Sequence, residues 1–162
     1  MKKCNTEIMK DIKKLEEVKD TLLKEENENC VVTFLQKETP IDTGYKYEET
    51  NEKIEKIDKE ILRLKSILAN ANVSTKVEGF DMSISEALVY LAQLNDKLRR
   101  LSMLVNIQPL RRRTISYDSA PEFTKICFDR NKVLKDYEET RNLIPKLQMA
   151  IDRTNLNNMI DC

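Results

Sequence analysis

The sequence predicts a mainly α protein: a helical bundle with heptad-patterned helices and a small β-hairpin or sheet at one end. Three observations lead to this prediction: the composition, several apolar stripes at helical spacing, and a few short β-branched runs. Of 162 residues, 35% are charged and 40% apolar, with only 2 Gly and 4 Pro. Such a composition is typical of long helices with few turns. The length suits one domain, residues 1–162.

Four helices are predicted, over residues 5–28, 50–71, 84–107 and 129–154. In each range, apolar residues recur at steps of three and four between charged ones, which places them on one face of a helix. The second and third ranges have the most regular stripes, typical of a coiled-coil seam. The stripe of the second is Ile54, Ile57, Ile61, Leu64, Leu68 and Ala71, and that of the third runs from Ile84 to Val105.

Side chains that could cap helix N-termini stand near the predicted starts. Asn5 or Thr6 is expected to cap the first helix and Asp129 the fourth. Ser83 and Glu86 have the spacing of a capping box at the start of the third. Pro145 lies within the fourth range and lacks the amide hydrogen that a helix needs, so we expect a kink or a split there.

Three short segments have strand character. Residues 30–36 (CVVTFLQ) are β-branched and aromatic, too few for a helix, and are followed by a turn-rich loop. Residues 113–117 and 122–128 flank a turn at Asp118–Pro121 and are expected to form a β-hairpin. The strand at 30–36 and this hairpin would together make the small sheet at one end of the bundle.

Several functional classes are excluded by composition. The chain has 28 basic and 28 acidic residues, so a net charge of zero removes the general attraction to long nucleic acid or to an anionic membrane. It has no histidine, which removes Ser-His and Cys-His nucleophiles and the commonest transition-metal ligand. We therefore predict a protein that is not an enzyme and that holds no metal and no cofactor.

The cysteines and the N-terminus indicate where the protein resides. Cysteines stand at positions 4, 30, 127 and 162 without any CxxC pair, which argues against a zinc framework or a disulfide scaffold and favours free thiols. The N-terminus leads into a charged helix pattern, and no stretch approaches the roughly 20 apolar residues of a membrane span. A cytoplasmic location is expected.

The order of motifs resembles the septicolysin-like family of small bacterial helical proteins. The matching motifs are Asn72-Val73-Ser74-Thr75, a turn at Gly79, Ile84-Ser85-Glu86-Ala87-Leu88 at the start of a Leu-rich helix, and Glu122-Phe123-Thr124-Lys125-Ile126 ahead of the segment from Val133 to Ile151. The resemblance covers the chain from about Glu52 onward. It implies a helical fold with a β-hairpin, an oligomer, and no accepted catalytic residues.

The run Arg111-Arg112-Arg113 is the one local concentration of charge that acids do not dilute. Guanidinium groups together with hydroxyls are what a phosphate site needs. Side chains alternate between the two faces of a strand, so Arg111 and Arg113 could converge on one ligand while Arg112 points away. The candidate site is therefore Arg111, Arg113 and Tyr117, with Arg99 from a neighbouring chain.

Two functional hypotheses follow. In the first, a homo-oligomer sequesters a small anionic ligand, such as a nucleotide signal, at this arginine cluster. In the second, the protein is a coiled-coil-type adaptor or structural protein whose charged helical faces bind a protein partner, and the arginines are solvated surface charge. Asp118 and Glu122 are interpreted as turn residues, and Tyr45, Tyr47 and Phe80 as aromatics that pack their own loops.

Overall fold

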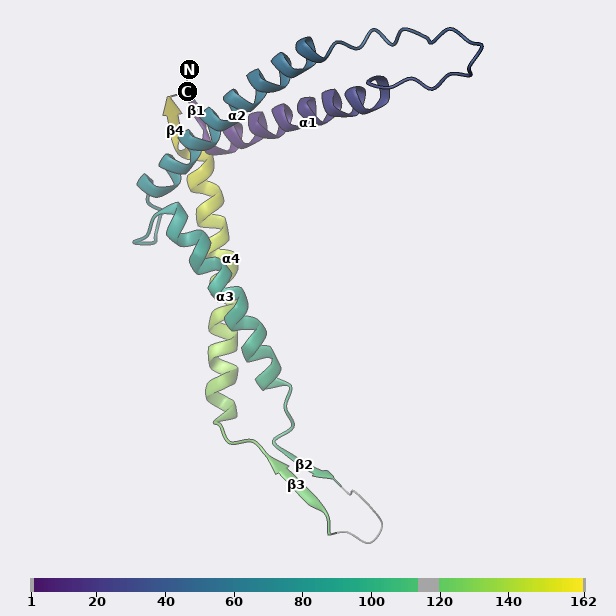
Figure 1. The fold of residues 1–162 in the computed structure, drawn as a ribbon. Helices are drawn as coiled ribbons and strands as arrows, with labels where there is room; N and C mark the ends of the chain where they lie inside the picture. The colour runs from purple at the N-terminus through teal and green to yellow at the C-terminus, as the bar shows by residue number, and fades with distance from the viewer. Residues whose placement is uncertain (1, 114–119, 162) are drawn as a thin grey trace. The chain divides into compact units, whose positions relative to one another are not determined.

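A computed structural model describes residues 2–113 and 120–161 (Figure 1). Four helices account for most of it: α1 (Asn5–Asn29), α2 (Tyr47–Ser74), α3 (Ile84–Val105) and α4 (Arg130–Asn157). Four short strands accompany them: β1 (Lys2–Cys4), β2 (Leu110–Arg113), β3 (Glu122–Lys125) and β4 (Met159–Asp161). The predicted fold class, mainly α with small sheets at helix ends, is confirmed.

The chain divides into two compact units, each with its own core. The first unit comprises residues up to Thr75 together with those from Asn155 onward, and the second comprises Lys76–Thr154. In the first unit α1 and α2 lie side by side (Figure 1) around a core of Ile8, Ile12, Ile61 and Leu64. In the second unit α3 lies along α4, and the core between them is Val77, Ile84, Ala87, Leu94, Leu147 and Ile151.

The apolar stripes predicted for the helices are the helix faces that pack into the cores. Ile61, Leu64 and Ala71 of α2 are buried, while the residues between them along the helix are largely exposed. The capping box predicted for α3 is present: the Ser83 amide donates to the Glu86 carboxylate at 2.7 Å, and the Glu86 amide donates to the Ser83 hydroxyl at 3.2 Å. Asp129 also caps α4 as predicted, since its carboxylate accepts from the amide of Asn131 at 2.9 Å.

The prediction for the start of α1 was wrong. Cys4 is the N-cap residue, in extended conformation, and its amide donates to the Glu7 carboxylate at 2.8 Å. The extended backbone follows from pairing, because β1 and β4 form an antiparallel ladder in which Cys4 is opposite Met159. Asn5 is then the first helical residue, and its side chain is fully buried.

The predicted strand at 30–36 was also wrong. Residues 30–46 connect α1 to α2 without helix or strand. A β-branched run becomes a strand only where another strand accepts its backbone hydrogen bonds. The two sheets of the described residues instead pair β1 with β4 and β2 with β3, so this segment has no ladder to join.

The hairpin exists, but its first strand begins earlier than predicted, and its second strand ends at Lys125 instead of residue 128. β2 covers Leu110–Arg113 and pairs with β3, with Leu110 opposite Lys125 and Arg113 opposite Glu122. Residues 114–117 of the predicted strand, and Asp118 in the predicted turn, lie outside the described residues. The amide of Ile126 donates to the carbonyl of Pro109 at 3.1 Å, which continues the pairing past the strand ends.

The predicted split at Pro145 is absent. α4 continues as one helix from Arg130 to Asn157 with Pro145 inside it. A proline removes one hydrogen bond from the ladder. Thr140, Leu147 and Ile151 are buried on both sides of it along the helix, so the packed face holds the two halves together.

Candidate functional site

The hairpin presents two chemically different faces, because paired residues in an antiparallel ladder share a face and neighbours alternate. Arg111 is opposite Thr124 and Arg113 opposite Glu122, which together form what we term the Arg111 face. Leu110 is opposite Lys125 and Arg112 opposite Phe123, which form the Phe123 face. All eight side chains are exposed.

The Arg111 face borders a hollow of about 600 Å³ that we term the hairpin groove. It is lined by Asn106, Ile107, Gln108, Arg111 and Thr124. Asn106 caps the C-terminus of α3, and its amide donates to the carbonyl of Ser102 at 3.2 Å. A guanidinium, a hydroxyl and two carboxamides therefore meet around one apolar side chain, a set of groups able to hydrogen-bond an oxyanion.

A helix C-terminus carries partial negative charge, which on its own would repel an anion from the groove. One guanidinium counters this effect. Arg130, at the start of α4, donates from Nη1 to the carbonyl oxygen of Ile107 at 3.3 Å. This bond places a further positive charge beside the groove and ties the first turn of α4 to the loop that carries Ile107 and Gln108.

Of the four residues predicted for the site, three are described by the structure, and one of these lines the groove. Arg111 lines the groove, and Arg113 lies two residues further along the same face, opposite the carboxylate of Glu122. Arg99 is an exposed residue of α3 that forms an ion pair with Asp96 of the same helix. Among the described residues, those that line the hairpin groove do not include Arg99. Tyr117 lies outside the described residues.

Asn106, Gln108 and Thr124 were not predicted as site residues. Thr124 could have been found from the sequence, because a hairpin register that pairs residues 111 and 124 places its hydroxyl beside Arg111. Asn106 and Gln108 carry no such signal, since their position depends on where α3 ends.

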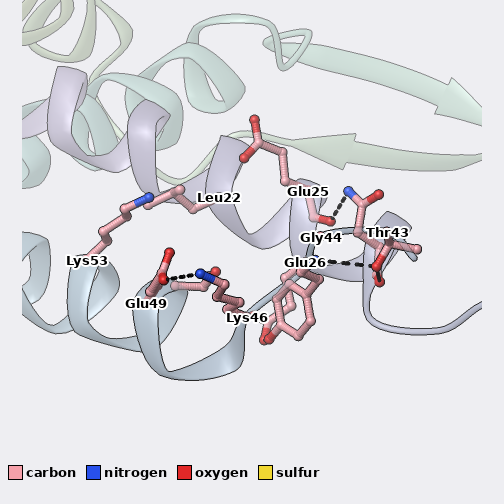
Figure 2. A pocket seen from close by; sticks show the side chains of 11 residues that line it. Leu22, Glu25, Glu26, Thr43, Gly44, Lys46, Glu49 and Lys53 are labelled. Carbon is pink, nitrogen blue, oxygen red and sulfur yellow. Dashed lines mark hydrogen bonds and ion pairs between the residues drawn. The ribbon is translucent and has the colours of Figure 1, made fainter.

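A second, smaller hollow of about 200 Å³ lies where the 30–46 connection meets the helices of the first unit (Figure 2). We term it the loop hollow. Figure 2 shows Glu25 and Glu26 from α1 and Glu49 and Lys53 from α2 around it. Lys46 Nζ and Glu49 Oε1 form an ion pair at 2.7 Å, which raises the pKa of Lys46 and lowers that of Glu49.

Tyr45 fastens the connection to α1 at this hollow. Its hydroxyl donates to the carboxylate of Glu26, and this bond raises the pKa of Tyr45 to about 12. The Thr43 hydroxyl donates to the carbonyl of Asn29 at 2.7 Å. Gly44, with φ of +69°, is in the left-handed region that glycine adopts without strain. The end of the connection therefore rests on α1, consistent with the packing role predicted for Tyr45.

The described part of the chain offers no metal centre and no membrane span. No group of three or more Cys, Asp or Glu side chains in it is arranged to hold a metal ion. None of its helices is long and apolar enough to cross a bilayer.

The fold is that of a small, mainly α protein in which one pair of long helices is joined by a long connection and the other by a β-hairpin. A solved structure has the same fold. It is a functionally unknown conserved protein from Corynebacterium diphtheriae, with a TM-score of 0.65 and 15% sequence identity, covering 99% of this chain and 100% of that one. At this identity the likeness concerns the fold alone. No protein-family model and no curated protein matches the chain.

Proposed function

We propose that this chain is a non-enzymatic binding protein that captures a small anionic ligand, such as a nucleotide, in the hairpin groove. The observation that carries the proposal is the position of Arg111 directly opposite Thr124, with both lining one hollow that Gln108 and Asn106 also line. The volume, about 600 Å³, lies within the range of small-molecule sites.

Each lining group has a role in this proposal. Arg111 supplies a planar guanidinium, which binds two phosphate oxygens at once. The Thr124 hydroxyl and the carboxamides of Gln108 and Asn106 supply hydrogen bonds whose donor and acceptor character adapts to the ligand. Ile107 offers an apolar surface for a planar ring. Stoichiometric capture follows, because these groups include no general base and no nucleophile beside one.

The remaining predicted residues would act at the margin of the groove. Arg113 is on the correct face, but Glu122 opposite it competes for its guanidinium. Arg99 would have to exchange Asp96 for the ligand. Tyr117 is kept in the proposal on its sequence position alone. Arg111 is therefore the residue whose loss should matter most.

We also propose self-association, membership of the septicolysin-like family and a cytoplasmic location, with no role in binding long nucleic acid. The balanced charge supports the last of these. The alternative function, an adaptor for a protein partner, draws support from the 30–46 connection, where Val31, Leu35 and Ile41 are exposed. Exposed apolar side chains grouped in one segment are typical of protein-binding surfaces.

A thermal shift experiment tests ligand capture. Inorganic pyrophosphate, ADP and ATP are added to the wild type at low and high salt. A ligand at about 100 times its Kd adds roughly 2.7 kcal/mol, or roughly 5 to 10 °C for a chain of this size. The shift should shrink at high salt, because salt screens the phosphate charges.

Two neighbouring substitutions make a matched pair. Arg111→Gln should abolish the ligand-induced shift, whereas Arg112→Gln removes the same charge from the opposite face of the strand and should leave the shift in place. Equal loss in both variants would mean that only general charge attracts the ligand. If no phosphate compound shifts the wild type, ligand capture is wrong and the adaptor function is the better explanation.

A further inference from the structure

The zero net charge of the chain conceals two oppositely charged regions, one at an end of the helix pair in each unit. Residues 16–56, which hold the second half of α1, the 30–46 connection and the start of α2, contain 12 acidic and 6 basic residues, a net charge of −6. Residues 96–135, which hold the second half of α3, the hairpin and the start of α4, contain 10 basic and 4 acidic residues, a net charge of +6. We term these the acidic end and the basic end.

The acidic end exposes apolar side chains next to its carboxylates. Val31, Leu35 and Ile41 are 73%, 70% and 77% exposed, and Phe34 is half exposed. The connection that carries them is 17 residues long without helix or strand, and loops of this length in small proteins commonly have a binding role. The loop hollow at its base is lined by Glu25, Glu26 and Glu49 together with Lys46 and Lys53 (Figure 2).

The basic end has the complementary composition on the Phe123 face of the hairpin. Leu110 and Phe123 are 60% and 61% exposed and are flanked by Arg112 and Lys125. In the described part of the hairpin, this face has two apolar side chains, two cations and no carboxylate. It is separate from the Arg111 face, which borders the groove proposed to hold the ligand.

The chain has enough exposed area to accommodate such a contact. The chain exposes 12502 Å². Two separate globular proteins of half its mass would together expose roughly 10,000 Å². The excess, roughly 2,500 Å², is comparable to what a stable protein interface buries.

We propose that the Phe123 face of one copy docks on the acidic end of a second copy. The opposite charges and the apolar side chains on both surfaces support a second copy of this chain as the occupant. Because two different surfaces meet, the contact is heterologous, and repeating it yields a closed ring or an open filament. This inference rests on the self-association in the proposed function and is independent of ligand capture.

Two charge-reversed variants test the contact. The hairpin variant is Arg112→Glu with Lys125→Glu. The loop variant is Glu25→Lys, Glu28→Lys and Glu48→Lys, which leaves Glu26 to bond Tyr45 and Glu49 to pair with Lys46. The control is Arg141→Glu with Lys146→Glu, the same charge change as the hairpin variant on exposed positions of α4 outside both ends. Circular dichroism verifies that every variant keeps its helix content.

Light scattering then measures mass at micromolar to submillimolar concentration. The wild type and the control should form assemblies larger than a dimer, and each reversed variant alone should have the 19.0 kDa mass of one chain. An equimolar mixture should regain a mass above that of one chain, because the hairpin variant retains a working acidic end and the loop variant retains a working Phe123 face. The two substituted surfaces, glutamates in one variant and lysines in the other, also carry opposite charges and would add to this recovery.

Three results would overturn the proposal: a monomeric wild type, reversed variants that keep the wild-type mass, or a mixture that keeps the mass of one chain. Its failure is distinguishable from failure of ligand capture. Arg112→Glu changes the mass and leaves the pyrophosphate-induced thermal shift, whereas Arg111→Gln removes the shift and leaves the mass. A substitution of Phe123 by Ser, which changes no charge, should also lower the mass.

Discussion

Asn5 Nδ2 donates a hydrogen bond of 2.9 Å to Oδ1 of Asn155, which lies 150 positions later in the chain. The same Nδ2 lies 3.3 Å from Oδ1 of Asn72, and Asn158 donates to Oδ1 of Asn5 at 3.5 Å. Asn158 also donates to the Thr75 hydroxyl at 2.9 Å. Asn5 is 0% exposed and its partners are half-buried, so a set of carboxamides joins the start of α1 to the ends of α2 and α4.

Removing the Asn5 carboxamide should destabilise the first unit. Its three partners would lose hydrogen bonds inside the protein, which costs about 1 to 3 kcal/mol of unfolding free energy. We expect Asn5→Ala to lower the urea midpoint accordingly. Asn27→Ala, at an exposed position of the same helix, should change the unfolding free energy by less than about 0.5 kcal/mol. Equal stability of the two variants would show that the buried carboxamides do not contribute.

Two alanine substitutions on α4, two residues apart, compare a core position of the second unit with an exposed one. Leu147 is 0% exposed, and Leu147→Ala should cost about 2 to 5 kcal/mol because it removes buried methyl groups and leaves a cavity. Met149 is 63% exposed, and Met149→Ala should cost less than about 0.5 kcal/mol. Thermal unfolding of both variants measures the difference, and a comparable loss at Met149 would mean that this face of α4 is covered in the folded protein.

The hydrogen bond between Tyr45 and Glu26 should make the stability of the protein depend on pH in the alkaline range. Its pKa is raised from 10.0 to about 12 by the hydrogen bond to Glu26, so the folded protein holds the phenol proton more tightly than the unfolded chain does. The stability that this bond contributes is fully present below pH of about 10 and is lost as the pH rises to about 12. Tyrosinate absorbance should show Tyr45 titrating with its midpoint at a pH of about 12.

Two variants assign this late titration. It should vanish in Tyr45→Phe, and in Glu26→Gln it should move back toward the ordinary tyrosine pKa, because the amide carries no negative charge. A difference curve between the wild type and Tyr45→Phe with its midpoint near 10 would contradict the Tyr45–Glu26 bond.

Replacing Pro145 by alanine should stabilise the protein. It is exposed and lies inside a continuous helix, where it removes one backbone hydrogen bond. Pro145→Ala restores the amide and should raise the unfolding free energy, by up to about 3 kcal/mol. The melting temperature should rise with it. A lower melting temperature would mean that the helix geometry around Pro145 is itself required by the packing of Leu147.

The helices could be predicted because their causes are local. The stripe from Ile54 to Ala71 makes one face of α2 apolar whatever it packs against. The capping box of Ser83 and Glu86 spans three residues and needs no tertiary partner. The candidate site was predictable to the same extent: a run of three arginines in a strand places Arg111 and Arg112 on opposite faces by alternation alone.

Tertiary structure decided everything that depends on pairing between distant segments. The run at 30–36 has strand propensity but lies where no strand is available, whereas Lys2–Cys4 forms a strand because Met159–Asp161 lies beside it. That same pairing made Cys4 the cap of α1 and buried Asn5. The neighbours of Arg111 in the groove depend on where α3 ends and on the hairpin register. The sequence by itself determined the helices and their packing faces, because backbone hydrogen bonds within a helix are local. Only the tertiary structure determined the sheets, the carboxamide contacts of Asn5 and the groove, because the partners in each of them are far apart along the chain.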